Sequence, residues 1–220
     1  MELNGKIIVG LGDSLMRGQH LQPYEAWLAL MGEQYGMEYH SHCISGTSVA
    51  SSDITKGPPM WKRLRDEITY DHVDFFVLQG GANDCAHNVP IGVNDDNLGD
   101  FGDVTGEIPT FKGALNYIIN TVKIRWPGVK LLLLTNYDRK FRVSDMGLRD
   151  EAYVDAMVEL ARYRGVAVVD NYHEIGLDLR NPKQAGCVTD YGWAATPDSH
   201  LSAAGHRWLM PVYAKKLTEL

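Results

Sequence analysis

The sequence predicts an α/β domain in which helices cover both faces of a five-stranded parallel sheet. Short apolar segments alternate along the chain with longer segments whose apolar residues recur at three-to-four spacing, an alternation typical of parallel sheets. Val129–Thr135 is an almost continuous apolar run, as expected of a parallel strand that is buried on both faces. Helical connections between such strands lie on the two faces of the sheet.

The first two predicted strands flank one predicted helix. Ile7–Val9 is a short apolar run that predicts the first buried strand, and Met37–Cys43 predicts the second. Between them, Tyr24–Met31 predicts a helix, because Pro23 stands at its start, where a missing amide hydrogen costs nothing. Gly36 is the predicted end of this helix.

The middle of the chain predicts a helix, a strand and a long loop. A glycine and two prolines at 57–59 break the chain before Met60–Arg65, which predicts a helix with an apolar stripe. Val73–Gln79 predicts the third strand, which ends at Gly80 and Gly81. The segment 84–109 is rich in aspartate and glycine and shows no helical or alternating period. We therefore expect a long loop excursion there, of the kind that usually has a functional role.

The last part of the chain repeats the strand–helix alternation. Phe111–Trp126 predicts a helix that precedes the fourth strand. Asp145–Arg164 predicts a further helix, and Val166–Asp170 predicts the fifth strand. A loop over residues 180–199 and a final helix at Ser202–Leu217 complete the expected order.

Length and composition predict one domain over residues 1–220 and exclude several classes of function. A net charge of −7 argues against nucleic acid or an anionic membrane as a partner. No apolar run is long enough for a membrane span and the N-terminus lacks a signal-peptide pattern, so we expect a cytoplasmic location. Cys43, Cys85 and Cys187 show no metal-ligand spacing, and we expect neither a metal nor a cofactor. The sequence predicts no oligomeric state.

Four residues that suit acyl transfer lie beside predicted elements. Ser14 stands in a glycine-containing turn after the first strand, Gly46 follows the second, Asn83 follows the third, and His200 precedes the last helix. Ligands bind at the carboxyl ends of the strands in open α/β sheets, so these groups are expected to lie near one another. Acyl transfer requires a nucleophile, a base within hydrogen-bond reach and donors for the developing oxyanion, and this set offers candidates for each.

The same residues resemble the SGNH (GDSL) hydrolases, a superfamily of esterases and lipases. Gly12–Leu15 reads Gly-Asp-Ser-Leu, Gly46 and Gly81–Asp84 match the second and third blocks of the family, and His200 matches the histidine of the fifth. The resemblance spans nearly the whole chain and implies a three-layer α/β/α fold with a flavodoxin-like sheet. It also implies that Ser14 is the nucleophile and His200 the general base. The implied oxyanion donors are the amides of Ser14 and Gly46 and the side chain of Asn83.

One departure from the family concerns the group that orients His200. The last block of the family is usually Asp-x-x-His, whereas this chain has Asp198-Ser199-His200, with Pro197 at the usual place of the aspartate. We expect Asp198 to orient the imidazole, because one acceptor at the other ring nitrogen is enough to fix its tautomer. Asp190 or a backbone carbonyl is the alternative.

Three further polar residues are expected to be structural. Asp13 is predicted to bond backbone amides of its turn and Asp84 to hold its loop in place. His206 fits the spacing of the last helix and is predicted to be a packing residue rather than a second base.

These features predict a serine esterase that hydrolyses small O-acyl esters, such as acetyl or other short acyl groups on carbohydrate. The polar excursion at 84–109, with Trp61, Tyr191 and Trp193 expected near the mouth of the site, suits a polar ligand better than a long acyl chain. The alternatives are a lipase or thioesterase of the same fold, and a glycan-binding module without catalysis, which only the shortened Asp–His spacing supports.

Overall fold

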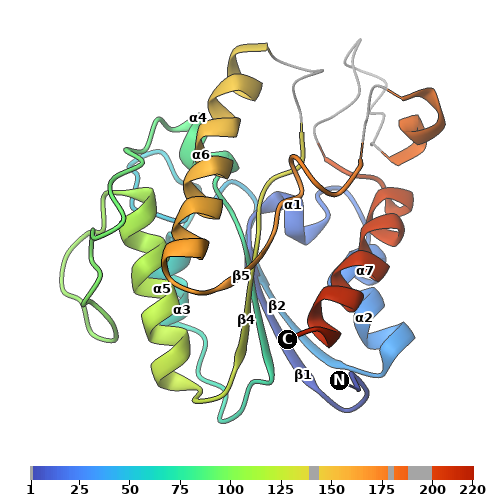
Figure 1. Ribbon diagram of the computed structural model, residues 1–220, viewed down its shortest axis with the longest axis horizontal. Coiled ribbons are helices and arrows are strands. Elements are labelled where there is room, and N and C mark those ends of the chain that lie inside the picture. Colours follow the sequence, from blue (N-terminus) through green and yellow to red (C-terminus); the bar gives the residue numbers. More distant parts are fainter. Residues whose placement is uncertain (1, 139–143, 178–180, 188–199) are drawn as a thin grey trace.

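A computed structural model describes residues 2–138, 144–177, 181–187 and 200–220, and these form the predicted α/β architecture (Figure 1). All strand pairs in the described sheet are parallel, and the strand order is β2-β1-β3-β4-β5. The strands are β1 (Ile7–Gly12), β2 (Glu38–Cys43), β3 (Phe75–Gln79), β4 (Lys130–Leu134) and β5 (Ala167–Val169).

Helices lie on both faces of the sheet, as expected. One face carries α3 (Met60–Asp66), α5 (Phe111–Arg125) and α6 (Ser144–Tyr163), and the other carries α2 (Trp27–Tyr35) and α7 (Ala203–Thr218) (Figure 1). Two short helices, α1 (Ser14–Arg17) and α4 (Ala82–Ala86), follow β1 and β3. None of the described helices is long and apolar enough to cross a membrane.

Two apolar cores form because successive side chains of each strand point to opposite faces of the sheet. Phe76 and Leu78 of β3 pack in the core beneath α3, α5 and α6. Phe75 and Val77 of the same strand pack in the core beneath α2 and α7. All four side chains are fully buried, so both faces of β3 are covered and its apolar run is explained.

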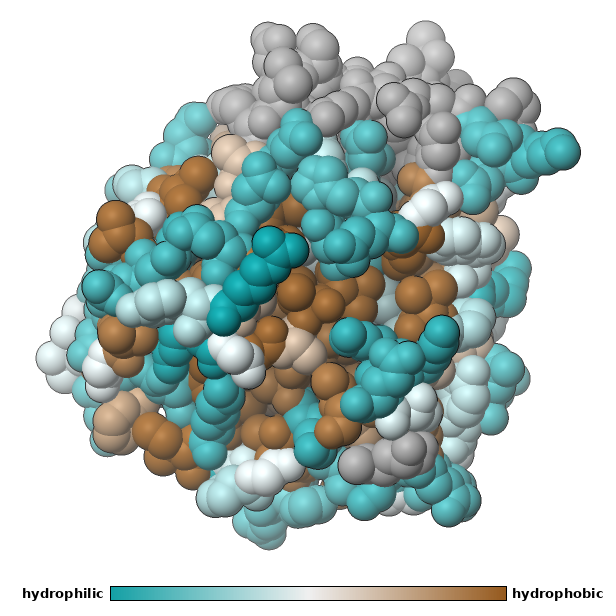
Figure 2. Space-filling view, viewed as in Figure 1, coloured by the Kyte–Doolittle hydropathy of each residue, from teal (hydrophilic) through white to brown (hydrophobic). Residues whose placement is uncertain are grey.

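Strand β5 forms one edge of the sheet and is shorter than predicted. Its three residues are only half-buried, and it ends at Val169 because Asp170 begins a turn there. Asp170 accepts hydrogen bonds from the backbone amides of Tyr172 and His173. Figure 2 shows this side of the molecule, where apolar residues gather at the middle of the surface and are surrounded by polar ones.

The predicted first helix is also divided. Pro23–Glu25 form a short 3₁₀ helix, and the extended backbone of Ala26 separates it from α2, which begins at Trp27, ends at Tyr35 and is capped by Gly36.

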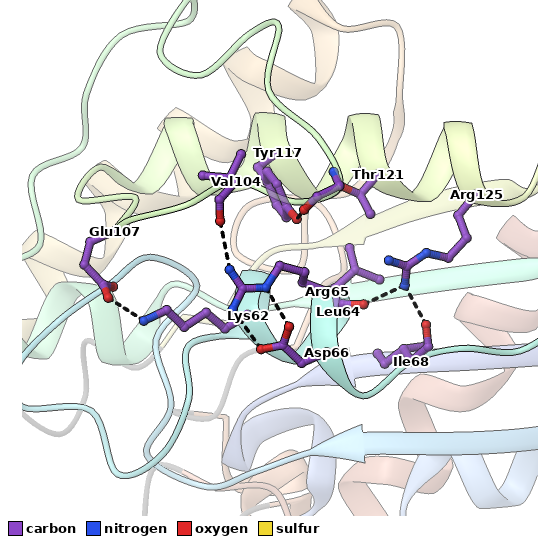
Figure 3. Close-up of polar contacts among 11 residues, drawn as sticks. Lys62, Leu64, Arg65, Asp66, Ile68, Val104, Glu107, Tyr117, Thr121 and Arg125 are labelled. Carbon is purple, nitrogen blue, oxygen red and sulfur yellow. Dashed lines mark hydrogen bonds and ion pairs between the residues drawn. The ribbon is translucent and has the colours of Figure 1, made fainter.

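The loop excursion lies along helices α3 and α5. Residues 82–86 form α4, so the irregular part runs from residue 87 to 110 rather than from 84. Arg65 donates a hydrogen bond to the carbonyl of Val104 at 2.9 Å, and Lys62 pairs with Glu107 (Figure 3). On α5, the side-chain amides of Asn116 and Asn120 each donate to two carbonyls between residues 94 and 100.

Trp61 does not lie at the mouth of a site, and this expectation was wrong. Its side chain is fully buried beneath α5, where its ring meets Tyr117 edge-on and its indole nitrogen donates to Ser51. A tryptophan on the inner stripe of a helix is driven into the core by its large apolar area. The other two expected aromatic residues, Tyr191 and Trp193, lie outside the described residues.

The chain reverses its direction of travel across the sheet after β2. From β1 it passes to β2 at one edge, then returns to β3 on the other side of β1. Ligands of open α/β sheets bind at such a switch point, outside the carboxyl ends of the strands. Ser14 directly follows β1 at this point.

Candidate active site

Ser14 is presented by a tight turn between β1 and α1. Asp13 is the N-cap of α1, and its fully buried carboxylate accepts a hydrogen bond from the amide of Leu15 at 2.8 Å. A side chain at Gly12 would lie only 2.7 Å from the Cβ of Met16, so the turn has room for glycine alone. Asp13 therefore has the structural role expected of it, and the turn fixes the position of the Ser14 side chain.

His200 meets Ser14 although the two residues are 186 positions apart in the chain. The distance from His200 Nε2 to Ser14 Oγ is 2.9 Å, within hydrogen-bond reach. His200 stands just before α7, whose N-cap Ser202 accepts a hydrogen bond from the amide of Gly205. The start of this helix therefore positions the imidazole beside the turn of Ser14.

The groups expected to orient His200 are not described. Asp198, the predicted orienter, and Asp190, its alternative, both lie outside the described residues. The assignment of Asp198 stays a prediction.

Gly46 lies in a loop that returns toward the turn of Ser14. Its φ of +80° favours glycine, and a Cβ there would lie 2.7 Å from the side chain of Lys56. The next residue, Thr47, is fully buried, and its hydroxyl donates to the carbonyl of Ile44 at 2.8 Å. The backbone of this loop is thus held in one conformation next to the site.

Asn83 joins the loop of Gly46 to the turn of Ser14. It lies in α4, and its Nδ2 donates to the carbonyl of Thr47 at 2.9 Å and to the carboxylate of Asp13 at 3.1 Å. These bonds use both hydrogens of the side-chain amide. A bound oxyanion would therefore have to replace one of these two acceptors, and the carboxylate is at the longer distance.

Asp84 holds the same loop from the other side. Its fully buried carboxylate accepts hydrogen bonds from the amides of Val49 at 2.9 Å and Ala50 at 3.0 Å. Burial is the main cause that raises the pKa of Asp84 to about 7, with a smaller contribution from Asp13. The structural role predicted for Asp84 is confirmed by these contacts.

Arg63 was missed by the sequence reasoning. Its guanidinium is fully buried, and Nη2 donates to the carbonyl of Gly12 at 3.0 Å and to the hydroxyl of Thr47 at 2.9 Å. Further N–H groups donate to the carbonyls of His42 and Pro58. Arg63 thus connects the end of β1 to the loop of Gly46. The only sequence signal was its position three residues after Met60, on the apolar face of α3.

His206 is a packing residue, as predicted. It is buried, and its Nδ1 accepts a hydrogen bond from the amide of Trp27 at 3.2 Å. Burial, with a contribution from the charge of His200, lowers the pKa of His206 to about 4, so this imidazole is neutral at pH 7. Ser14 Oγ is bonded to His200 and not to His206, so His206 is not placed to act as a second base.

Among the described residues, no group of three or more histidine, cysteine, aspartate or glutamate side chains is arranged to hold a metal ion.

Comparison with known proteins identifies the family. The family model described as GDSL-like Lipase/Acylhydrolase family matches residues 11–208, a range that contains both Ser14 and His200. A comparison with curated protein sequences gave no significant match.

Solved structures share the fold over nearly the whole chain. A protein from Lactobacillus plantarum is 22% identical, with a TM-score of 0.74 and coverage of 98% of both chains. A member of the lipolytic protein G-D-S-L family from Veillonella parvula is 14% identical, with a TM-score of 0.65 and coverage of 98% of this chain and 100% of that chain. An active-site mutant of a family two carbohydrate esterase from Clostridium thermocellum is 15% identical, with a TM-score of 0.64 and coverage of 97% and 63%.

The family match covers the turn of Ser14, the Gly46 loop, α4 and His200, and the solved structures show the same fold. The chain therefore belongs to the GDSL-like lipase/acylhydrolase family.

Proposed function

We propose that this protein is a serine esterase that hydrolyses small O-acyl esters, with acetyl or other short acyl groups on carbohydrate as the favoured substrates. The observation that carries the proposal is the 2.9 Å contact between Ser14 Oγ and His200 Nε2 at the carboxyl end of β1. A hydroxyl becomes a useful nucleophile when a base can take its proton, and a neutral imidazole is the usual base.

In the proposed reaction, Ser14 Oγ attacks the carbonyl carbon while His200 takes its proton. The negative charge that develops on the carbonyl oxygen is stabilised by the amides of Ser14 and Gly46 and by the Asn83 side chain. His200 then gives the proton to the leaving alcohol, and an acyl-enzyme on Ser14 remains. A water molecule, activated by His200, releases the acid and restores the serine.

Asn83 requires one adjustment in this mechanism. Its Nδ2 hydrogens are bound to Thr47 and Asp13, so a substrate oxyanion would take the place of the Asp13 carboxylate at 3.1 Å. Asp13 keeps its bond from the amide of Leu15 when this happens, which limits the loss.

One observation supports a carbohydrate ester over a lipid: the cleft described below is lined in large part by polar side chains. The shared fold does not separate the two, because the family two carbohydrate esterase and the lipolytic family member match it equally well. A lipase or thioesterase of the same fold is the alternative, and such an enzyme would have a long apolar channel for the acyl chain.

The test is the hydrolysis of p-nitrophenyl acetate by the wild type beside Ser14→Ala. We expect turnover by the wild type and its loss in the variant, with an unchanged thermal unfolding temperature. Equal rates would overturn the proposal and leave glycan binding without catalysis as the leading function. A panel of esters of increasing acyl length, with acetylated oligosaccharides, then separates a carbohydrate esterase from a lipase.

A further inference from the structure

A cleft of about 490 Å³ lies beside the turn of Ser14. It is bounded by the segment that follows α1, by α2 and by the edge strand β2. Arg17, Gln19 and His20 line the cleft, together with Tyr39 and Ser41 of β2, and the amide of Gln19 donates to the carbonyl of Ser14 at 3.0 Å. None of the described residues that line this cleft carries a carboxylate, although the whole chain has a net charge of −7. The guanidinium of Arg17 is therefore the one formal charge among the described residues that line the cleft.

Arg17 supplies the cationic group. It is exposed, one helical turn after Ser14, and within the described residues it forms no ion pair with a carboxylate. Its Nη1 donates to the hydroxyl of Ser45 at 3.2 Å, and Ser45 in turn donates to Gln19. Guanidinium has five N–H donors in a planar fork, so this single bond leaves donors that can bind a carboxylate or phosphate.

His20 shows which part of an ester this cleft would receive. Its ring meets the ring of His200 edge-on, with the centroids 5.9 Å apart, and it also lines the cleft. His20 has a φ of +74°, a left-handed conformation that is strained for a residue with a Cβ and is often retained at functional sites. His200 must deliver its proton to the leaving oxygen, so the leaving alcohol lies on the side of the imidazole. His20 packs against this imidazole and also lines the cleft, which makes the cleft the candidate site for the alcohol.

We propose that this cleft binds the alcohol portion of the substrate and that Arg17 selects alcohols that carry an anionic group, a carboxylate or a phosphate. This inference rests on the proposed esterase function and names its substrate class more closely: an acylated acidic alcohol, such as an acidic or phosphorylated sugar. Arg17 contacts the alcohol in both the ground state and the transition state, so it should act mainly on KM.

The test compares three acetate esters that differ only in the group on the alcohol. These are 4-acetoxybenzamide, which is neutral, 4-acetoxybenzoate and 4-acetoxyphenyl phosphate. For each, kcat/KM is measured with the wild type, with Arg17→Gln and with Arg162→Gln. Arg162 is exposed in the last turn of α6, and its replacement makes the same change in net charge away from the strand ends that carry Ser14.

The quantity compared is the ratio of kcat/KM for each anionic ester to kcat/KM for the neutral ester, 4-acetoxybenzamide. We expect Arg17→Gln to lower this ratio by about fivefold to tenfold, as for a charge pair at the protein surface. The loss should appear as a higher KM and should shrink as salt is raised. Arg162→Gln should keep the wild-type ratios. The benzoate and the phosphate arms show which anion the cleft prefers.

Two results would overturn the inference. An unchanged ratio in Arg17→Gln would show that Arg17 does not meet the alcohol. Mono-4-nitrophenyl succinate carries its charge on the acyl group. If Arg17→Gln instead lowered kcat/KM for this ester relative to p-nitrophenyl acetate, the cleft would hold the acyl group. Failure of the esterase proposal itself looks different, because no ester would then be hydrolysed at a rate that depends on Ser14.

Discussion

Asp84 gives a prediction that can be worked out from the structure. Its carboxylate is fully buried, and burial raises its pKa from 3.8 to about 7. One pKa unit corresponds to about 1.4 kcal/mol, so a shift of about three units corresponds to about 4 kcal/mol. The folded state holds this proton more tightly than the unfolded state. The contribution to stability is therefore present below about pH 4 and is lost as the pH rises to about 7.

The perturbation is Asp84→Asn, which keeps the shape of the side chain and removes its titration. The asparagine oxygen of the variant can accept from one of the two backbone N–H groups of Val49 and Ala50, and its NH2 group then faces the other. This contact between two donors costs about 1 to 3 kcal/mol at acidic pH. The free energy of unfolding of the wild type should then fall, relative to the variant, by about 4 kcal/mol between pH 4 and pH 8.

The assay is urea unfolding of both proteins at half-unit pH steps across that range. Asp53→Asn removes an exposed carboxylate from the segment that follows Ala50, and it serves as the matched control, expected to unfold in parallel with the wild type. Parallel pH curves for the wild type and Asp84→Asn would refute the reasoning, because they would show that burial does not control the ionisation of Asp84.

Three further variants test the groups around the nucleophile. Asn83→Ala should lower kcat for p-nitrophenyl acetate about a hundredfold or more, as expected for one oxyanion donor, and an unchanged kcat would remove Asn83 from that role. Gly46→Ala should lower the free energy of unfolding by about 1 kcal/mol or more, because φ is +80° and Lys56 is in the way, and chemical denaturation measures this. Arg63→Met should lower it by about 3 kcal/mol, because the Gly12 carbonyl and Thr47 hydroxyl lose their donor; a loss below 1 kcal/mol would contradict this.

The fold and the pairing of Ser14 with His200 could be predicted, because the sequence signals for them are local or lie in short motifs. Apolar runs and helical periods predicted the five strands and the helices that cover them. Ser14 and His200 were recognised as a pair from residue type and from their places beside predicted elements. The structure brings their side chains within 2.9 Å.

Features that depend on tertiary contacts could not be predicted in the same way. Arg63 sits among apolar residues, and only the carbonyls of distant segments make its burial favourable. The excursion follows α5 because Asn116 and Asn120 meet its backbone carbonyls, and nothing in the local sequence of the loop indicates this. Trp61 was placed wrongly, because its indole can be either a stacking surface or core material.

The most direct test of the central claim, that His200 activates Ser14 as a nucleophile, is covalent labelling with diethyl p-nitrophenyl phosphate. This reagent phosphorylates an activated serine with release of one p-nitrophenol, and mass spectrometry of the peptides locates the adduct. The predicted result is one adduct per chain on Ser14, formed at least about a hundredfold more slowly in His200→Ala because the base that takes the proton is gone. An adduct on another residue, or equal labelling rates in the two proteins, would contradict the claim.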